Sequence, residues 1–224
     1  MDYQARTLIF MGMFGSGKTE ISLNIAQHFA RKGERTVVVD VDTVSPYFRS
    51  RDLMAVFEEK GIKIVAPEGA LAHADLPIIT PQVFGYLENP EYRVVLDVGG
   101  NDDGAVVLSS LSTRLQKTEC STFYVLNFYR PFNDTVENAV SHVLRLEEKS
   151  RMKIDFLVNN SNMGFETTQE HVFKGEAFVT EVSKRTSIPV AFTALMEGIS
   201  GRDGAYPRFH IMKYLKNSWE VEND

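Results

Sequence analysis

Apolar positions follow two patterns that alternate along the chain: short continuous runs and longer stretches with helical spacing. The runs Thr7–Met11 and Thr36–Val41 are typical of parallel strands that are buried on both faces. Between them, apolar side chains recur at helical spacing, which predicts a helix over Lys18–Arg31. Further strands are predicted at Ile62–Ala66, Arg93–Val98, Thr122–Asn127, Ile154–Asn159 and Ile188–Thr193. Further helices are predicted at Asp52–Lys60, Gln82–Leu87, Ala105–Gln116, Asp134–Glu148, Thr168–Thr186 and Pro207–Trp219.

This order of elements predicts an α/β fold. Seven strands joined by helical crossovers give a doubly wound, mainly parallel seven-stranded sheet. The 224 residues contain no repeat, no low-complexity tract and no linker-like stretch, so we expect a single domain over residues 1–224. Ligands of such sheets bind beyond the carboxyl ends of the strands, where functional side chains are therefore expected.

The first strand leads into a glycine-rich phosphate-binding pattern, Gly12-x-x-x-x-Gly17-Lys18-Thr19. An apolar strand precedes it and an amphipathic helix follows it, as the P-loop NTPase fold requires. Backbone N–H groups of the loop and of the helix N-terminus would bind the phosphates of a nucleoside triphosphate. We expect Lys18 to be exposed and to contact the β- and γ-phosphates, and the Thr19 hydroxyl to bind Mg²⁺.

Two further strands end in acidic residues. Asp40 and Asp42 follow one β-branched run, and Asp97 ends another that has Walker B character. We expect Asp97 to hold Mg²⁺ with support from Asp40, and Asp42 to orient or deprotonate the attacking water. Gly100 would offer a backbone N–H to the γ-phosphate and sense the nucleotide state. The alternative for each aspartate is a turn or capping role at a strand end.

Composition and charge narrow the range of cellular compartments and of binding partners. The formal net charge of −6 argues against a broad nucleic-acid surface. The chain has one cysteine, Cys120, and no Cys-x-x-Cys pair. No apolar run approaches the roughly 20 residues of a membrane span, and the N-terminus has no signal-like apolar core. These features favour a cytoplasmic protein and disfavour nucleic acid and membranes as its partners.

With these motifs taken together, the chain resembles the MinD/ParA-type P-loop ATPases, that is, the CobQ/CobB/MinD/ParA nucleotide-binding group, over nearly its whole length. The resemblance rests on the phosphate loop, on Asp40-x-Asp42 and on Asp97-x-x-Gly100. It implies that Asp42 activates water and that Asn159 and Asn160 contact adenine at the end of a strand. Met13 stands where the family's signature Lys would reach into a partner subunit, and cluster-binding cysteines are absent.

The choice between adenine and guanine depends on the segment Asn159-Asn-Ser-Asn162. The guanine-binding motif Asn-Lys-x-Asp ends in an acid, whereas Asn162 is an amide, which favours adenine. The alternative for Asn159 and Asn160 is a strand-end turn. The full predicted nucleotide site consists of Gly12, Met13, Phe14, Gly15, Ser16, Gly17, Lys18, Thr19, Glu20, Gly100, Asn159 and Asn160.

These features predict a Mg²⁺-dependent ATP-binding protein and slow ATPase in which Lys18 and Asp42 are catalytic. It would act as a nucleotide switch on a protein partner. Two further possibilities are a role in metalloenzyme assembly or activation and the formation of a homodimer. One alternative is a small-molecule phosphotransferase, in which Arg49 and Arg51 would serve a closing lid. Another is a nucleotide-gated positioning protein for DNA or membranes. Arg130 is a weaker candidate for the ligand edge, because it follows a predicted strand.

Overall fold

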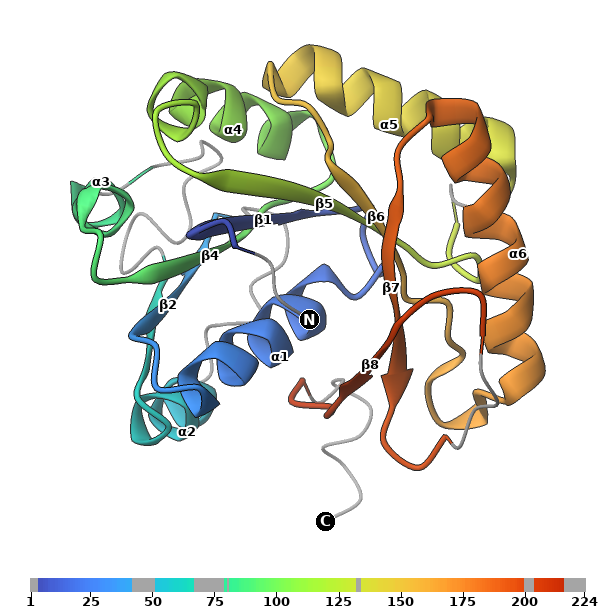
Figure 1. The fold of residues 1–224 in the computed structure, drawn as a ribbon, viewed down its shortest axis with the longest axis horizontal. Coiled ribbons are helices and arrows are strands. Elements are labelled where there is room, and N and C mark those ends of the chain that lie inside the picture. Colours follow the sequence, from blue (N-terminus) through green and yellow to red (C-terminus); the bar gives the residue numbers. More distant parts are fainter. Residues whose placement is uncertain are drawn as a thin grey trace.

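The computed structural model describes residues 4–41, 51–66, 79, 81–131, 134–199 and 204–215. These residues form one sheet of eight strands in the order β3-β2-β4-β1-β5-β6-β7-β8, with helices on both faces (Figure 1). The strands are β1 (Thr7–Met11), β2 (Thr36–Asp40), β3 (Ile62–Val65), β4 (Arg93–Asp97), β5 (Cys120–Leu126), β6 (Phe156–Asn159), β7 (Val190–Met196) and β8 (Arg208–Ile211). The helices are α1 (Lys18–Arg31), α2 (Arg51–Glu59), α3 (Pro81–Glu88), α4 (Asp102–Leu115), α5 (Val136–Ser150) and α6 (Gln169–Thr186), with a 3₁₀ turn at Gly164–Glu166.

The alternation of strands and helices and the parallel sheet are confirmed, since every neighbouring pair of strands is parallel. The predicted count of seven strands is wrong, because β8 adds an eighth. The sequence predicts a helix over Pro207–Trp219. In the structure Phe209 is paired with Ala194 of β7, and residues 212–215 continue without helical structure. Pairing to an open sheet edge therefore overrides a local helical pattern here.

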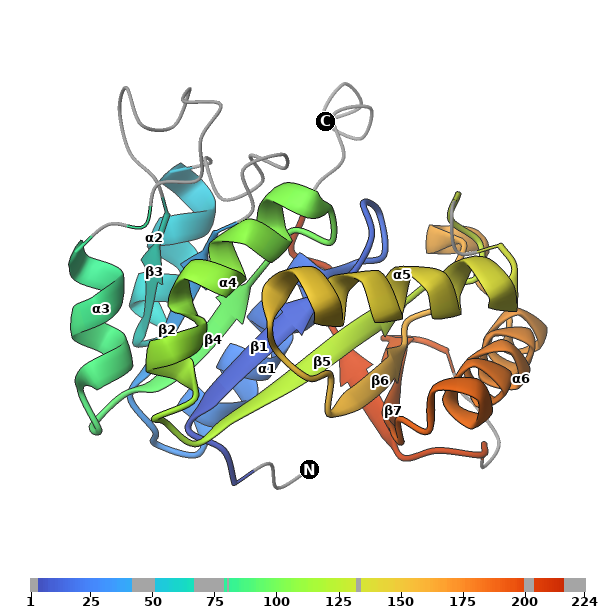
Figure 2. The same cartoon turned by 90° about the horizontal axis from the view of Figure 1, so that it is seen from above.

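Each central strand divides its side chains between two cores. In β1, Ile9 and Met11 face α3, α4, α5 and α6, whereas Leu8 and Phe10 face α1 and α2. Figure 2 shows α4 and α5 lying side by side over one face of the sheet. Phe10 stacks on Phe123 of β5 with ring centroids 4.9 Å apart. Each such buried apolar side chain contributes about 1.5–3 kcal/mol, so the sheet is a rigid support for the loops at its edges.

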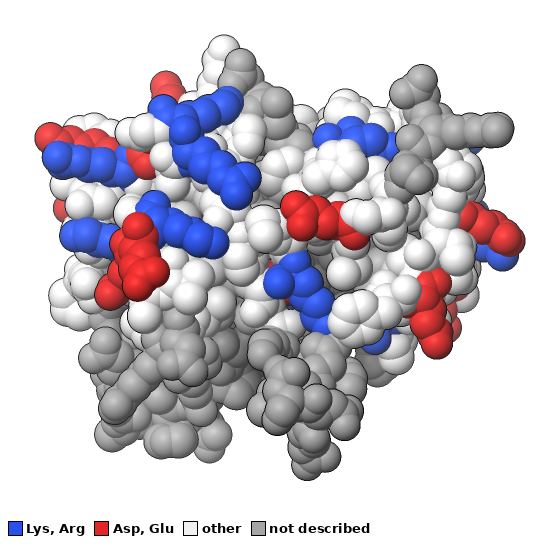
Figure 3. Space-filling view, turned by 90° about the horizontal axis from the view of Figure 1, so that it is seen from below, with Lys and Arg blue, Asp and Glu red and all other residues white. Residues whose placement is uncertain are grey.

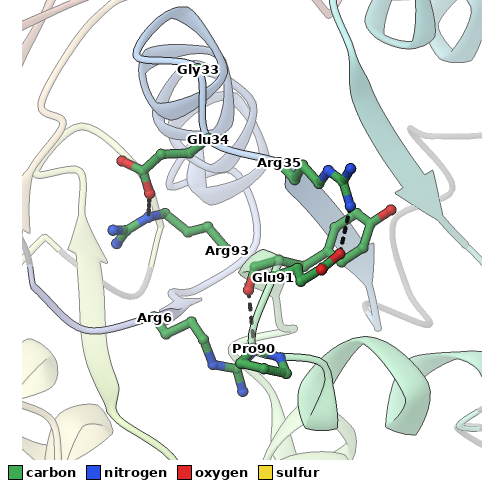
Figure 4. A pocket seen from close by; sticks show the side chains of 8 residues that line it. Arg6, Gly33, Glu34, Arg35, Pro90, Glu91 and Arg93 are labelled. Carbon is green, nitrogen blue, oxygen red and sulfur yellow. Dashed lines mark hydrogen bonds and ion pairs between the residues drawn. The ribbon is translucent and has the colours of Figure 1, made fainter.

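The amino-terminal edge of the sheet has a hollow that is lined by arginines (Figure 4). These arginines form ion pairs and hydrogen bonds with other residues of the protein. Arg93 pairs with Glu34, and Arg35 pairs with Glu91 at 2.5 Å. Arg6 donates to carbonyl oxygens at the end of α3 and beyond it, including those of Leu87, Asn89 and Tyr92. Arg6 thus caps the C-terminus of α3, and the hollow is explained as a structural junction on the edge opposite the phosphate loop.

Candidate nucleotide-binding site

The phosphate loop joins β1 to α1 at the carboxyl edge of the sheet. Lys18 is the first residue of α1, and Gly17 caps the helix in a left-handed conformation with φ of 85° and without a side-chain hydrogen bond. Glycine is required at this φ. A Cβ there would also lie 2.2 Å from the Asn160 amide nitrogen. Because no side chain of the cap occupies the first N–H groups of α1, they are available to an anion.

Three side chains converge beneath this loop. The Thr19 hydroxyl donates a hydrogen bond to Asp97 Oδ2 at 2.6 Å, and Asp97 is fully buried. Asp40 lies opposite Asp97 in the register of β2 and β4 and is also buried. The structure thus brings Thr19, Asp40 and Asp97 together, and their role as metal ligands stays a prediction. A hydroxyl and carboxylates are the hard oxygen donors that Mg²⁺ prefers, so the donor set fits this ion.

Lys18 differs from the expectation in one respect. It is 5% exposed rather than open to solvent. It nevertheless lines the pocket described below.

The loop after β4 supports the phosphate loop from the side. A Cβ at Gly100 would lie 2.1 Å from the Gly12 carbonyl oxygen and 2.6 Å from the Met13 nitrogen. Only glycine permits this close approach of two backbones. Gly100 therefore lies directly beside the first residues of the phosphate loop, and its contact with the γ-phosphate stays a prediction.

The loop after β6 contacts the phosphate loop through Asn160. Its side-chain amide donates to the Ser16 carbonyl oxygen at 2.8 Å. Asn159 has a different environment: its amide donates to the Thr193 hydroxyl at 3.4 Å and its oxygen accepts from the Ser161 backbone. Asn159 is fully buried and does not line the pocket. The predicted contact of Asn159 with a base has no support in this geometry, because the side chain is turned into the core beside β7, whereas Asn160 remains a candidate.

A pocket of about 360 Å³ opens above the phosphate loop. Its lining combines the loop with residues from the carboxyl ends of four other strands. The lining residues are Phe14, Gly15, Gly17, Lys18, Thr19, Glu20, Asn127, Arg130, Asn160, Asn162, Gly164, Met196, Ile211, Lys213 and Leu215. The volume lies within the range of small-molecule sites.

Part of this lining was not found from the sequence. Ile211, Lys213 and Leu215 come from the end of β8 and from the segment after it. The sequence predicts a helix over Pro207–Trp219, and this expectation gives no signal that the three residues line a pocket. Arg130 was only a weak candidate, and it lies over Gly15, whose Cβ would be 3.5 Å from the Arg130 Cδ.

Glu20 lines the pocket and has a clearly shifted pKa. Burial raises its pKa from 4.5 to about 7, against the opposing effect of backbone hydrogen bonds from Tyr214 and Leu215 and of the Lys213 charge. Desolvation thus outweighs the favourable contacts of the carboxylate.

The predicted catalytic residue Asp42, together with Arg49, lies outside the described residues. For Arg51 only the backbone is described, as the start of α2. Their roles stay predictions.

Comparisons with solved structures find the same fold. FtsY from Physcomitrella patens chloroplasts matches with a TM-score of 0.59 at 18% identity, covering 88% of this chain and 61% of that one. FtsY from Mycoplasma mycoides matches with a TM-score of 0.54 at 14% identity, covering 85% and 61%. FlhF complexed with GTP and Mg²⁺ matches with a TM-score of 0.54 at 16% identity, covering 85% and 66%. The chain thus spans about three fifths of the FtsY chains that it matches.

The sequence comparisons add the family. A search among curated proteins gives no match. The family model of the CobQ/CobB/MinD/ParA nucleotide binding domain matches residues 9–163, which include the phosphate loop, Asp97 and Asn160. With this match over more than half of its length, and with the phosphate loop, the Thr19–Asp97 contact and the parallel sheet in place, the chain belongs to the CobQ/CobB/MinD/ParA family of P-loop nucleotide-binding domains.

Proposed function

We propose that this protein is a Mg²⁺-dependent ATP-binding protein and slow ATPase that acts as a nucleotide switch on a protein partner. The observation that carries the proposal is the hydrogen bond between Thr19 and the buried Asp97 at the floor of the pocket. It joins the hydroxyl and the carboxylate that triphosphate sites of this fold use around Mg²⁺. Lys18, at the same floor, supplies the positive charge for the β- and γ-phosphates.

Mg²⁺ would be held by Thr19 directly and by Asp97 and Asp40 as hydrogen-bond acceptors for its water ligands. When bound, the ion neutralises phosphate charge and orients the terminal phosphate. Asp42 follows the end of β2 by two residues and would position the attacking water and accept its proton. Lys18 would stabilise charge that develops on the phosphoryl oxygens.

Two observations bear on the base. FlhF, which has the same fold, binds GTP and Mg²⁺. In this chain the loop after β6 carries Asn160 and Asn162 in the pocket lining and no acid between residues 159 and 162. An acid is the group that would accept hydrogen bonds from the guanine edge. We therefore propose a preference for ATP, worth about 1–3 kcal/mol if the guanine edge is left unpaired.

A switch also needs a surface that a partner can contact close to the nucleotide. Phe14, inside the phosphate loop, is 64% exposed and borders the pocket. A large apolar side chain at this place supports a protein partner, or a second copy of the chain, at the mouth of the site. Activation or assembly of a metalloenzyme is one process that such a switch would serve.

Charge distribution supports a protein partner over nucleic acid or membranes. The face in Figure 3 carries positive and negative side chains interspersed among neutral ones, and the net charge is −6. Several basic groups of the described residues are paired with acids, as Arg145 and Lys149 are with Asp102. No helix among the residues that the structure describes is long and apolar enough to cross a membrane.

Calorimetry with Mg-ATP and Mg-GTP on the parent protein and on Lys18→Ala tests the proposal. The parent is expected to bind Mg-ATP more tightly than Mg-GTP, and to bind ATP more weakly when Mg²⁺ is removed with a chelator. Lys18→Ala is expected to lose binding while retaining the circular dichroism spectrum of the parent. Lys184→Ala is a matched control, because this lysine is exposed on α6, away from the pocket lining. Unchanged ATP affinity in Lys18→Ala would refute the assignment of the site, and a tenfold preference for GTP would refute the choice of base.

A further inference from the structure

The segment Met212–Leu215, after β8, is bound to α1 by side chains rather than by a neighbouring strand. Asn24 pairs with both backbone groups of Met212: its Oδ1 accepts from the N–H and its Nδ2 donates to the carbonyl oxygen, each at 2.8 Å. One helical turn earlier, the two carboxyl oxygens of Glu20 accept from the N–H groups of Tyr214 and, at 3.2 Å, Leu215. Glu20 and Asn24 are four residues apart and thus lie on one face of α1.

Tyr214 fixes the same segment from its other side. Its hydroxyl donates to Gln27 Oε1 at 2.5 Å, and its ring packs edge-on against Phe57 of α2 with centroids 4.9 Å apart. Lys60 lies over the Tyr214 ring at 4.8 Å. The segment is therefore held by α1 and α2 together, although it has no regular secondary structure.

This bound segment forms one wall of the pocket above the phosphate loop. Lys213 and Leu215 line the pocket next to Ile211. The Lys213 ammonium lies 4.5 Å from the centre of the Phe165 ring. Phe165 belongs to the 3₁₀ turn after β6, whose Gly164 lines the pocket as well. Lys213 thus reaches from the C-terminal wall to the opposite wall.

We propose that Met212–Leu215 is a wall of the nucleotide site whose attachment depends on the bound nucleotide, with Glu20 as the residue that positions it and Lys213 as a contact to the ligand. This inference rests on the proposed nucleotide binding. Glu20 directly follows Thr19 in the first turn of α1, so ligand binding at the phosphate loop acts on the residue that holds the wall. Lys213 is a donor without acceptor capacity, and the phosphate and ribose oxygens of a nucleotide are acceptors.

The expected sequence of events follows from the strengths of these contacts. An exposed cation–π contact such as Lys213–Phe165 is weak, whereas a hydrogen bond from an ammonium to a phosphate oxygen is charge-assisted and stronger. A nucleotide in the pocket therefore draws Lys213 from the Phe165 ring toward the ligand. The backbone of residues 212–215 is then fixed from both sides, by Glu20 and by the nucleotide.

Hydrogen exchange of the backbone amides of Tyr214 and Leu215 tests the attachment. Without nucleotide, Glu20→Gln is expected to exchange at these amides about tenfold faster than the parent, because Gln retains one acceptor oxygen and loses the other. Glu170→Gln, which neutralises an exposed acid in the first turn of α6, is the matched control. If Glu20→Gln does not fold, Glu20→Asp replaces it, since the shorter side chain keeps the charge and draws the carboxyl oxygens away from both amides. Exchange at the parental rate in the folded variant would overturn the role of Glu20.

Binding of Mg-ATP tests the ligand contact. Saturation with Mg-ATP is expected to slow hydrogen exchange at the Tyr214 and Leu215 amides in the parent. Lys213→Ala is expected to bind Mg-ATP about tenfold more weakly than the parent, whereas the control Lys184→Ala is expected to bind it with parental affinity. If the parent binds Mg-ATP while exchange at residues 212–215 and the affinity of Lys213→Ala stay at parental values, the inference is wrong and nucleotide binding stands. If the parent binds no Mg-ATP, the proposed function is wrong, and the exchange experiment without nucleotide still decides the role of Glu20.

Discussion

Replacement of Gly100 by alanine is expected to weaken nucleotide binding without changing any residue that contacts the ligand through its side chain. The new Cβ would lie 2.1 Å from the Gly12 carbonyl oxygen, whereas real Cβ contacts stay at or above 3.0 Å. The phosphate loop must therefore move by about 1 Å relative to β4. Such a shift misaligns the N–H groups that bind phosphate. If two of these bonds are weakened, at about 1.5 kcal/mol each, Mg-ATP affinity falls about 100-fold.

Calorimetry measures the affinity, and thermal unfolding of the nucleotide-free protein measures the cost of the shift, expected at about 1–3 kcal/mol. Gly85→Ala is the matched control, because Gly85 lies in α3 and a Cβ there meets no atom within 4 Å. This control is expected to bind normally and to be more stable by about 0.5–1 kcal/mol, since alanine favours a helix. Parental affinity and stability in Gly100→Ala would show that the two loops do not meet as described.

Three further outcomes are expected. The buried Tyr124 hydroxyl has no hydrogen-bond partner among the described residues. Tyr124→Phe is therefore expected to leave the free energy of unfolding in urea unchanged or to raise it by about 1 kcal/mol. A large loss of stability would reveal a partner for the hydroxyl. The pKa of Glu20 is about 7 in the folded protein, compared with an ordinary value of 4.5. Its contribution to the stability of the fold is therefore fully present below pH 4.5 and is lost as the pH rises through 7. The free energy of unfolding is expected to decline between pH 5 and 8 by at most about 3 kcal/mol. Glu20→Gln is expected to remove this decline. Asp42→Asn is expected to bind Mg-ATP like the parent and to hydrolyse it about 100-fold more slowly in single-turnover assays; hydrolysis at the parental rate would place the base elsewhere.

Sequence patterns were sufficient for the elements whose signals are local. The continuous apolar runs of β1, β2 and β4 predicted a buried parallel sheet, because both faces of these strands meet helices. The glycine pattern before Lys18 predicted the phosphate loop, since its chemistry requires those residues at fixed spacing. The matched family model covers the same region.

Features that depend on contacts between distant residues were not predictable in the same way. Phe209 and Ile211 of β8 are partnered by β7, and only the open sheet edge distinguishes their pattern from a helix. Adjacent asparagines likewise have equal local signals, but Asn159 is turned toward Thr193 and Asn160 toward Ser16. Which of the two reaches the pocket is decided by the packing of β6 against β7.

The wide spacing of the pocket residues along the chain has a consequence for biosynthesis. The phosphate loop and the start of α1 leave the ribosome before their hydrogen-bond partners: Asp97 is 78 residues after Thr19, Asn160 is 144 residues after Ser16, and Leu215 is 195 residues after Glu20. A nascent chain folds from its N-terminus as it is synthesised. Until the last of these partners has emerged, the loop lacks the contacts that shape it. We therefore expect a nascent chain to retain nucleotide poorly until residue 215 has emerged and joined these contacts.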